Sequence, residues 1–165
     1  MNRSRTVYSR FMTMTATLMF GAIFCCLIPH TIIDVRPVDS KEKMCLAKNI
    51  FFEARGTDIE EMVRIINVTS NRVKASGKSY CKIVYEHAQF SWTMDLIRHN
   101  ISKLVHNFGD SKAWQEAQFL ADYELARGFP DTTGGALYYH NYDVEPRWPF
   151  KLTLASNYHK YYKPK

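Results

Sequence analysis

The feature that most constrains this chain is an uncharged stretch near its N-terminus. From Phe11 to Ile33 the sequence contains no Asp, Glu, Lys or Arg. As a helix, such a run would be about 34 Å long, against roughly 30 Å of hydrocarbon in a bilayer. A folded domain made from a chain of 165 residues has no need of so long an uncharged helix. We therefore predict a transmembrane helix over residues 11–33.

The flanking charges predict how this helix is oriented. The basic residues of segment 1–10 precede it, whereas the charged residues from Asp34 to Lys41 cancel one another. The positive-inside rule therefore places residues 1–10 in the cytoplasm and the rest of the chain outside. No A-x-A-like cleavage site follows the run, which favours a retained signal anchor over a cleaved signal peptide. Its threonines and alanines make the run only moderately hydrophobic, so the helix could leave the bilayer under some conditions.

Beyond the anchor, residues 34–42 are interpreted as a linker and residues 43–165 as an exported domain. The net charge is +6, and the positive excess after residue 33 is too small and too dispersed to predict a nucleic-acid partner. The two cysteines of this part, Cys45 and Cys81, could form a disulfide in an oxidising compartment. Two separate buried thiols are the alternative. Neither has a C-x-x-C partner, so we expect no metal site there.

Apolar periodicity and capping signals predict three long helices in the exported part. Their expected N-caps and glycine stops are Ser40 and Gly56, Thr57 (in a capping box with Glu60) and Gly77, and Asp110 and Gly128. A short helix is expected within residues 79–95, and another over 101–108. After Pro130 the pattern changes to a turn and strand at 134–141 and one further extended segment at 151–163. The predicted class is α+β: a mainly helical domain with a small β element, preceded by one transmembrane helix.

Glu53 occupies an unusual position for a carboxylate. It directly follows Ile50, Phe51 and Phe52, in the last turn of the first predicted helix. Apolar neighbours and the negative end of the helix dipole both raise the pKa of a carboxyl group. A raised pKa suits a general acid. The competing interpretation is an ordinary surface charge at the end of a helix.

Other catalytic patterns are missing from the sequence. There is no G-x-S-x-G, no H-E-x-x-H and no phosphate-binding glycine loop followed by lysine. His140 and His159 are interpreted as structural histidines rather than metal ligands, and no cofactor is expected. The segments "AQFSWT" and "GGALYYHN" bring amides, hydroxyls and aromatic rings together. Such groups are typical of a groove that binds N-acetylated sugars.

Six motifs occur in a fixed order: "CLAKNIFFEARG", "NRVKASG", "CKIVYE", "QFSWT", "PDTTGGALYYHN" and "HKYY". In this combination the chain resembles the SleB-type cell wall hydrolases of spore-cortex lytic enzymes and phage lysins, over roughly residues 43–162. The resemblance implies a lysozyme-like or transglycosylase-like fold and cleavage of peptidoglycan. It implies that Glu53 is the catalytic acid and that the substrate-binding residues are Gln89, Phe90, Ser91, Trp92, Tyr139 and His140. Thr57 stands where the family usually has a second glutamate, which leaves Glu53 alone in its motif.

The resemblance leads to a lytic transglycosylase as the first hypothesis. Hydrolysis of the same MurNAc–GlcNAc bond by a muramidase, or cleavage by an N-acetylmuramoyl-L-alanine amidase, are the enzymatic alternatives. A membrane-tethered module that only binds glycan is the non-enzymatic one. The expected partners are peptidoglycan strands and, through residues 11–33, the cytoplasmic membrane of a Gram-negative host. With its domain in the periplasm, the protein is expected to act as a monomeric phage endolysin of the signal-anchor type.

Overall fold

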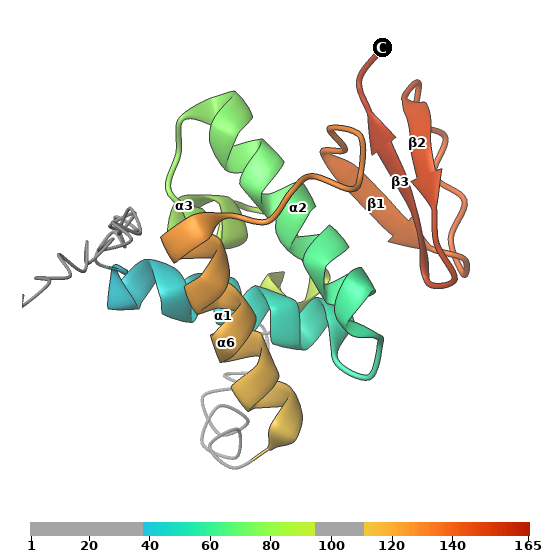
Figure 1. The fold of residues 1–165 in the computed structure, drawn as a ribbon. Helices are drawn as coiled ribbons and strands as arrows, with labels where there is room; N and C mark the ends of the chain where they lie inside the picture. Colours follow the sequence, from blue (N-terminus) through green and yellow to red (C-terminus); the bar gives the residue numbers. More distant parts are fainter. Residues whose placement is uncertain (1–37, 95–110) are drawn as a thin grey trace, which may run out of the picture. The chain divides into compact units, whose positions relative to one another are not determined.

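The computed structural model describes residues 38–94 and 111–165. The predicted anchor and the expected helix 101–108 lie outside these ranges. The elements of the described part, in chain order, are α1 (Ser40–Ala54), α2 (Ile59–Ser76), α3 (Tyr80–Val84), α6 (Lys112–Arg127), β1 (Tyr138–Asn141), β2 (Lys151–Ala155) and β3 (His159–Lys163) (Figure 1). Residues 40–42, expected in the linker, therefore belong to α1.

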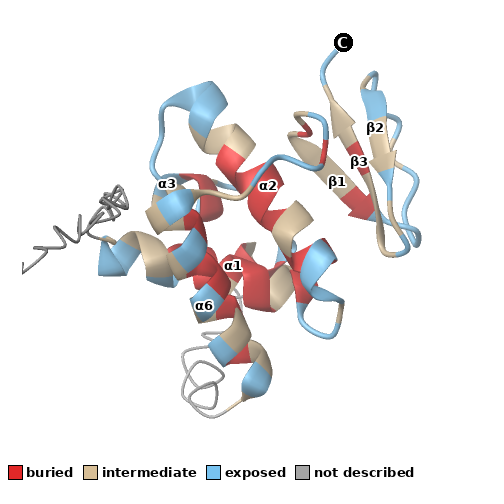
Figure 2. Ribbon diagram, viewed as in Figure 1, coloured by how far each residue is buried: buried red, intermediate tan, exposed pale blue. Residues whose placement is uncertain are grey.

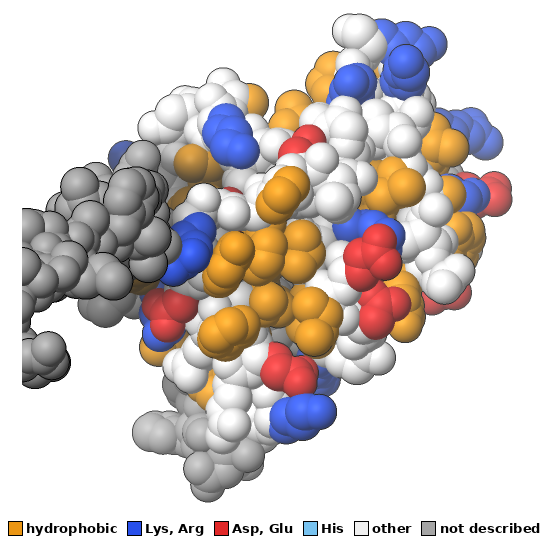
Figure 3. Space-filling view, viewed as in Figure 1, with side chains coloured by type: hydrophobic (Ala, Val, Ile, Leu, Met, Phe, Trp, Pro, Cys, Tyr) orange, Lys and Arg blue, Asp and Glu red, His pale blue; other side chains and the backbone are white. Residues whose placement is uncertain are grey.

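The helices form the main core. α1 packs against α6, α2 and α3, so that it is covered on several sides. Leu46 and Ile50 of α1 meet Ile65 of α2 and Leu120 of α6 in one buried cluster. Figure 2 shows the buried residues where these helices face one another. On the outside, Figure 3 shows hydrophobic side chains gathered over the helical part, where Phe119 of α6 is exposed.

The helix starts differ from those predicted by one residue each. Asp39, not Ser40, caps α1, and its carboxylate accepts from the backbone N–H of Lys41 (2.8 Å). Asp58 caps α2 and accepts from Glu61 N–H (2.8 Å), while the expected cap, Thr57, donates its hydroxyl to the Ala54 carbonyl. The reason is competition between adjacent capping residues, because Asp and Ser or Thr satisfy the free N–H groups about equally well. For α6 the cap is Ser111, and the predicted Asp110 lies outside the described residues.

The C-terminal part is a three-stranded antiparallel sheet in the order β1-β3-β2. The prediction of one extended segment over 151–163 was wrong, because this stretch is a hairpin of β2 and β3. Its turn lacks the Gly or Pro that would have signalled it. Instead the Ser156 hydroxyl accepts from the N–H groups of Tyr158 (3.1 Å) and His159 (3.0 Å). The sheet packs on α2 through Tyr161, Val68 and Ala136.

A disulfide joins Cys45 of α1 to Cys81 of α3, with a Cα–Cα distance of 5.1 Å. It ties the short helix α3 to the core across 36 positions of sequence. Next to it, the Glu42 carboxylate accepts from Cys81 N–H (3.1 Å). The sequence left open a disulfide or two separate buried thiols, and the structure contains the disulfide.

Within residues 38–94 and 111–165, no helix has the length and apolar character needed to cross a membrane.

Candidate active site

Glu53 lies in the last turn of α1, at the edge of a pocket between the helices and the sheet. The pocket has a volume of about 350 Å³. Its walls come from α1, α2, the segment before Trp92, β1 and the start of β3. The residues that line it are Glu53, Arg72, Gln89, Phe90, Ser91, Tyr139, His140, Asn141, Val144 and His159. Residues far apart in sequence are thus brought around one carboxyl group.

Burial dominates the electrostatics of Glu53. Removal from water raises the pKa of its carboxyl group above the ordinary value. Three neighbours partly oppose this rise: the hydrogen bond from Tyr139, and the nearby His159 and Arg72. The sequence prediction of a raised pKa therefore has the correct direction. An acid with a raised pKa holds its proton to higher pH, as a proton donor requires.

Tyr139 fixes the orientation of the carboxyl group. Its hydroxyl donates to Glu53 Oε2 at 2.6 Å from the middle of β1. Burial and the adjacent Glu53 raise the pKa of Tyr139 well above its usual value, so the phenol stays protonated and remains a donor. Glu53 is held by the helix α1 and Tyr139 by the strand β1, so the hydrogen bond between them leaves the Glu53 side chain little conformational freedom.

Of the substrate-binding residues predicted from sequence, most lie around the pocket. Gln89, Phe90, Ser91, Tyr139 and His140 all line it. Trp92 does not. It is 7% exposed, stacks on Phe52 with ring centroids 4.6 Å apart, and donates its indole N–H to Asn49 Oδ1 (3.2 Å). The structure therefore gives Trp92 a packing role beneath Phe52, next in sequence to the candidate acid.

His140 has both ring nitrogens engaged. Nδ1 lies 2.7 Å from the Asn141 carbonyl oxygen, and Nε2 lies 3.0 Å from the Tyr162 hydroxyl. The ring also stacks on that of Tyr162, at 5.2 Å between centroids. These contacts agree with the structural interpretation of this histidine, although one side of it lines the pocket.

Two charged or titratable residues of the pocket, Arg72 and His159, received no catalytic or substrate-binding role from sequence reasoning, which interpreted His159 as a structural histidine. Arg72 belongs to the "NRV" motif and His159 to "HKYY", so both lay in segments already singled out. Their place in the pocket depends on contacts with residues about half the chain away, such as Leu137 for Arg72 and Glu61 for His159. No local sequence pattern encodes such contacts. Asn141 and Val144 complete the rim of the pocket.

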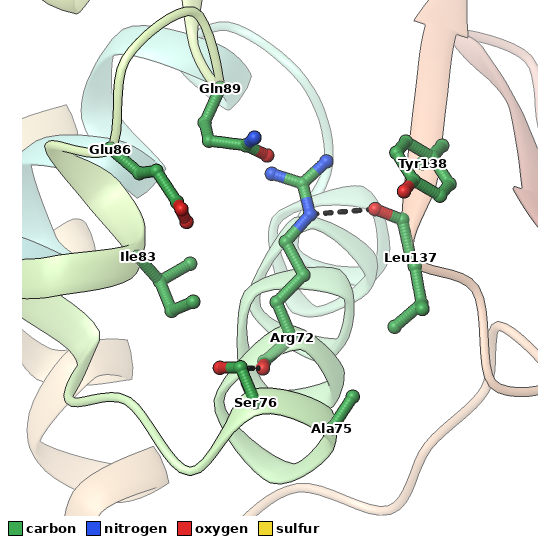
Figure 4. A pocket seen from close by; sticks show the side chains of 8 residues that line it. All are labelled: Arg72, Ala75, Ser76, Ile83, Glu86, Gln89, Leu137 and Tyr138. Atoms are coloured by element: carbon green, nitrogen blue, oxygen red, sulfur yellow. Dashed lines mark hydrogen bonds between the residues drawn. The ribbon is translucent and has the colours of Figure 1, made fainter.

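Arg72 also lines a second hollow, of about 200 Å³ (Figure 4). Both hollows share Arg72 and Gln89. The guanidinium Nε donates to the Leu137 carbonyl (2.6 Å), and the group lies over the rings of Phe90 and Tyr138 at 5.1 and 5.6 Å. Its Nη1 is buried and has no partner among the described residues. A fixed cation therefore stands near Glu53, where its charge favours the ionised form of the carboxyl group.

Three further carboxylates of the chain could be considered as a second acid, and two of them have other roles in the structure. Asp58 caps α2, and Asp131 accepts from the Thr133 hydroxyl and Gly135 N–H, both at 2.7 Å. Asp95 lies outside the described residues. Among the residues that line the described pocket, Glu53 is the sole carboxylate. The described ranges also hold no cluster of three His, Cys, Asp or Glu residues able to bind a metal.

Comparison with known proteins identifies the family of this chain. A family model described as "Cell Wall Hydrolase" matches residues 56–162. The chain belongs to the cell wall hydrolase family. The match includes Arg72, Gln89, Tyr139 and His159, and it begins three positions after Glu53.

This cell wall hydrolase also shares its fold with a solved structure. The crystal structure of the catalytic domain of the Bacillus cereus SleB protein is 21% identical, with a TM-score of 0.54, and the alignment covers 78% of this chain and 95% of that one. The SleB-type family predicted from the sequence motifs is thereby confirmed. So is the mixed class of helices with a small sheet. A comparison with curated proteins found no match.

Proposed function

We propose that this cell wall hydrolase cleaves the MurNAc–GlcNAc bond of peptidoglycan as a lytic transglycosylase, with Glu53 as its acid. One observation carries the proposal. Glu53, with a raised pKa, is the sole carboxylate among the described residues that line the pocket. Ordinary glycosidases use two carboxylates on opposite sides of the scissile bond. A pocket with one suits a reaction in which the substrate supplies its own nucleophile.

In the first step, the protonated carboxyl group of Glu53 donates its proton to the glycosidic oxygen. The C1–O bond breaks and positive charge develops on the muramyl ring. The carboxylate left on Glu53 is stabilised by the Tyr139 hydroxyl and the nearby Arg72 guanidinium. In the second step, the muramyl C6 hydroxyl attacks C1, gives its proton to the Glu53 carboxylate and closes a 1,6-anhydro ring.

The polar groups around Glu53 fit a sugar substrate. Gln89, Ser91 and Asn141 offer amide and hydroxyl groups, while Tyr139 supplies aromatic surface. Sugar hydroxyl and acetamido groups need the former, and the apolar faces of sugar rings need the latter. An amidase would instead require zinc or an activated cysteine. The two cysteines of the described part are joined to each other.

The products of digestion test the proposal. Purified peptidoglycan should yield muropeptides with 1,6-anhydro-muramyl ends, which mass spectrometry separates from hydrated ends by the mass of one water. Hydrated ends alone would replace the transglycosylase by a muramidase. Free stem peptides would indicate an amidase, and an unchanged polymer to which the protein binds would indicate a glycan-binding module.

Replacing Tyr139 by Phe should move the alkaline limb of the activity profile to higher pH. Its hydroxyl stabilises the Glu53 carboxylate and so lowers the pKa that burial raises. Without it, the pKa of Glu53 rises further, and the protonated, active form persists to higher pH. The measurement is kcat/KM against pH for the wild type and Tyr139→Phe. Tyr123→Phe, at an exposed position of α6, is the matched control. A limb that stays in place or moves to lower pH would contradict the assigned roles.

We further propose that residues 11–33 anchor the enzyme in the cytoplasmic membrane with its catalytic part in the periplasm, as a phage endolysin exported by its host would require. The length and lack of charge of this run support the proposal. The Cys45–Cys81 disulfide supports it independently, because such bonds persist in oxidising compartments and are rare in the cytosol.

A further inference from the structure

His159 connects the pocket to a fully buried carboxylate. The residue opens β3, and its side chain is 12% exposed. Its Nδ1 lies 2.6 Å from Oε1 of Glu61, a residue of α2 with 0% exposure. The ring also makes a T-shaped contact with the ring of Tyr139, with centroids 5.1 Å apart, and the Tyr139 hydroxyl in turn donates to Glu53. A chain of contacts therefore runs from Glu61 through His159 to the candidate acid.

Glu61 is held as an anion. Burial alone would raise the pKa of this carboxyl group, but hydrogen bonds from His159, Tyr161 and Arg64 lower it to about 2. The Tyr161 hydroxyl donates at 2.6 Å and Arg64 Nη1 at 2.9 Å. An ionised carboxylate can only accept hydrogen bonds. His159 must therefore donate from Nδ1, which assigns the proton of the neutral ring to that nitrogen.

The remaining ring nitrogen of His159, Nε2, has no hydrogen-bond partner among the described residues. It is not a buried atom either, so part of its surface is accessible. His159 also lines the same pocket as Glu53. With Nδ1 protonated, Nε2 carries the free lone pair. The arrangement presents a base to the substrate, supported from behind by a buried negative charge that stabilises the protonated ring.

We propose that His159, oriented by Glu61, is a second proton-transfer residue of this active site. This proposal rests on the function proposed above. It divides the two proton transfers of the reaction between two residues. Glu53 gives its proton to the departing glycosidic oxygen as the C1–O bond breaks. His159 Nε2 accepts the proton of the attacking hydroxyl as the new C1–O bond forms. Each turnover leaves a Glu53 carboxylate and a protonated His159, and transfer of one proton back, through water, restores both.

The leaving glycosidic oxygen and the attacking C6 hydroxyl lie on the same face of C1. Glu53 on α1 and His159 on β3 line one pocket, so the two residues can serve that face together. Glu61 acts through His159 and does not touch the substrate, so it is a positioning residue.

The decisive variant is His159→Asn. The asparagine amide nitrogen takes the place of Nδ1 and can still donate to Glu61, whereas nothing remains at the position of Nε2. We expect kcat on peptidoglycan to fall roughly 100-fold or more, the usual contribution of a general base. KM and the thermal unfolding midpoint should change little. In His159→Ala, added imidazole should restore activity, and it should have no effect on the wild type or on His87→Ala, an exposed histidine outside the pocket.

The outcomes separate this inference from the proposed function. A wild type that cleaves peptidoglycan beside an equally active His159→Asn would overturn the inference alone. Loss of activity in His159→Ala without rescue, combined with full activity of His159→Asn, would reduce His159 to a structural donor to Glu61. A wild type that does not cleave peptidoglycan would overturn both proposals.

Discussion

Replacing Glu53 by Gln is expected to abolish cleavage of peptidoglycan while the protein stays folded. Glutamine has nearly the same shape and can still accept the hydrogen bond from Tyr139, but it has no proton to give to a leaving oxygen. Removing a general acid lowers rates by roughly 100- to 10,000-fold. The measurement is the release of soluble muropeptides from purified peptidoglycan, with products identified by mass spectrometry. Because Tyr139, Arg72 and the other walls remain, binding of glycan fragments should persist.

The stability of Glu53→Gln provides a second readout. Burial raises the pKa of Glu53 in the folded state above its unfolded value, so the protonated form stabilises the fold at low pH. That contribution is lost as the pH rises through the folded pKa. At neutral pH the variant should therefore unfold at the same temperature as the wild type or above it. Glu116→Gln, on α6 and outside the pocket, is the matched control and should keep full activity. Cleavage by Glu53→Gln at the wild-type rate would refute the assigned acid.

Removing the disulfide should have the largest effect on stability. With serine at both Cys45 and Cys81, the free energy of unfolding is expected to fall by about 4 kcal/mol, the chain-entropy value for a loop of 36 residues. Domains of this size are commonly stable by only about 5–15 kcal/mol in total. The bond also holds α3, and with it the chain that leads to Gln89 and Phe90 of the pocket. Urea denaturation followed by circular dichroism measures the loss.

Reduction supplies the control for this second prediction. Dithiothreitol should destabilise the wild type by a similar amount and leave the double serine variant unchanged. Equal unfolding midpoints for the oxidised wild type and the variant would contradict the prediction. The same two cysteines report the compartment in cells: thiol trapping should find them oxidised in the full-length protein, and free thiols would argue against export.

The sequence predicted the helices well because their signals are local. Apolar spacing and glycine stops at Gly77 and Gly128 mark where α2 and α6 end, and both glycines take positive φ angles there. Glu53 could be found for the same reason, since its apolar neighbours and its place in the last turn of α1 are visible within a few residues. The caps were displaced by one position because neighbouring Asp, Ser and Thr residues compete for the same N–H groups.

The parts that sequence reasoning missed depend on contacts between distant segments. The β2–β3 turn is closed by the Ser156 side chain rather than by a glycine, so no strong turn signal was present. The pairing of His159 with Glu61 joins residues 98 positions apart. Trp92 was assigned to the groove through the family resemblance, whereas in the structure its partners Phe52 and Asn49 lie on α1. A motif does not show whether an aromatic ring lines a pocket or packs behind its wall.

The place of β3 in the sheet has a consequence for the order in which this enzyme becomes active. β3 is the last strand in the chain and yet the middle one in space, between β1 and β2. It carries His159, and it pairs with the strand that holds Tyr139 against Glu53. The helical core can collapse through contacts closer in sequence, whereas the pocket needs pairings that close long loops, which are slow to form. A newly made chain would therefore pass through a compact but inactive stage and gain its activity on the cell wall last.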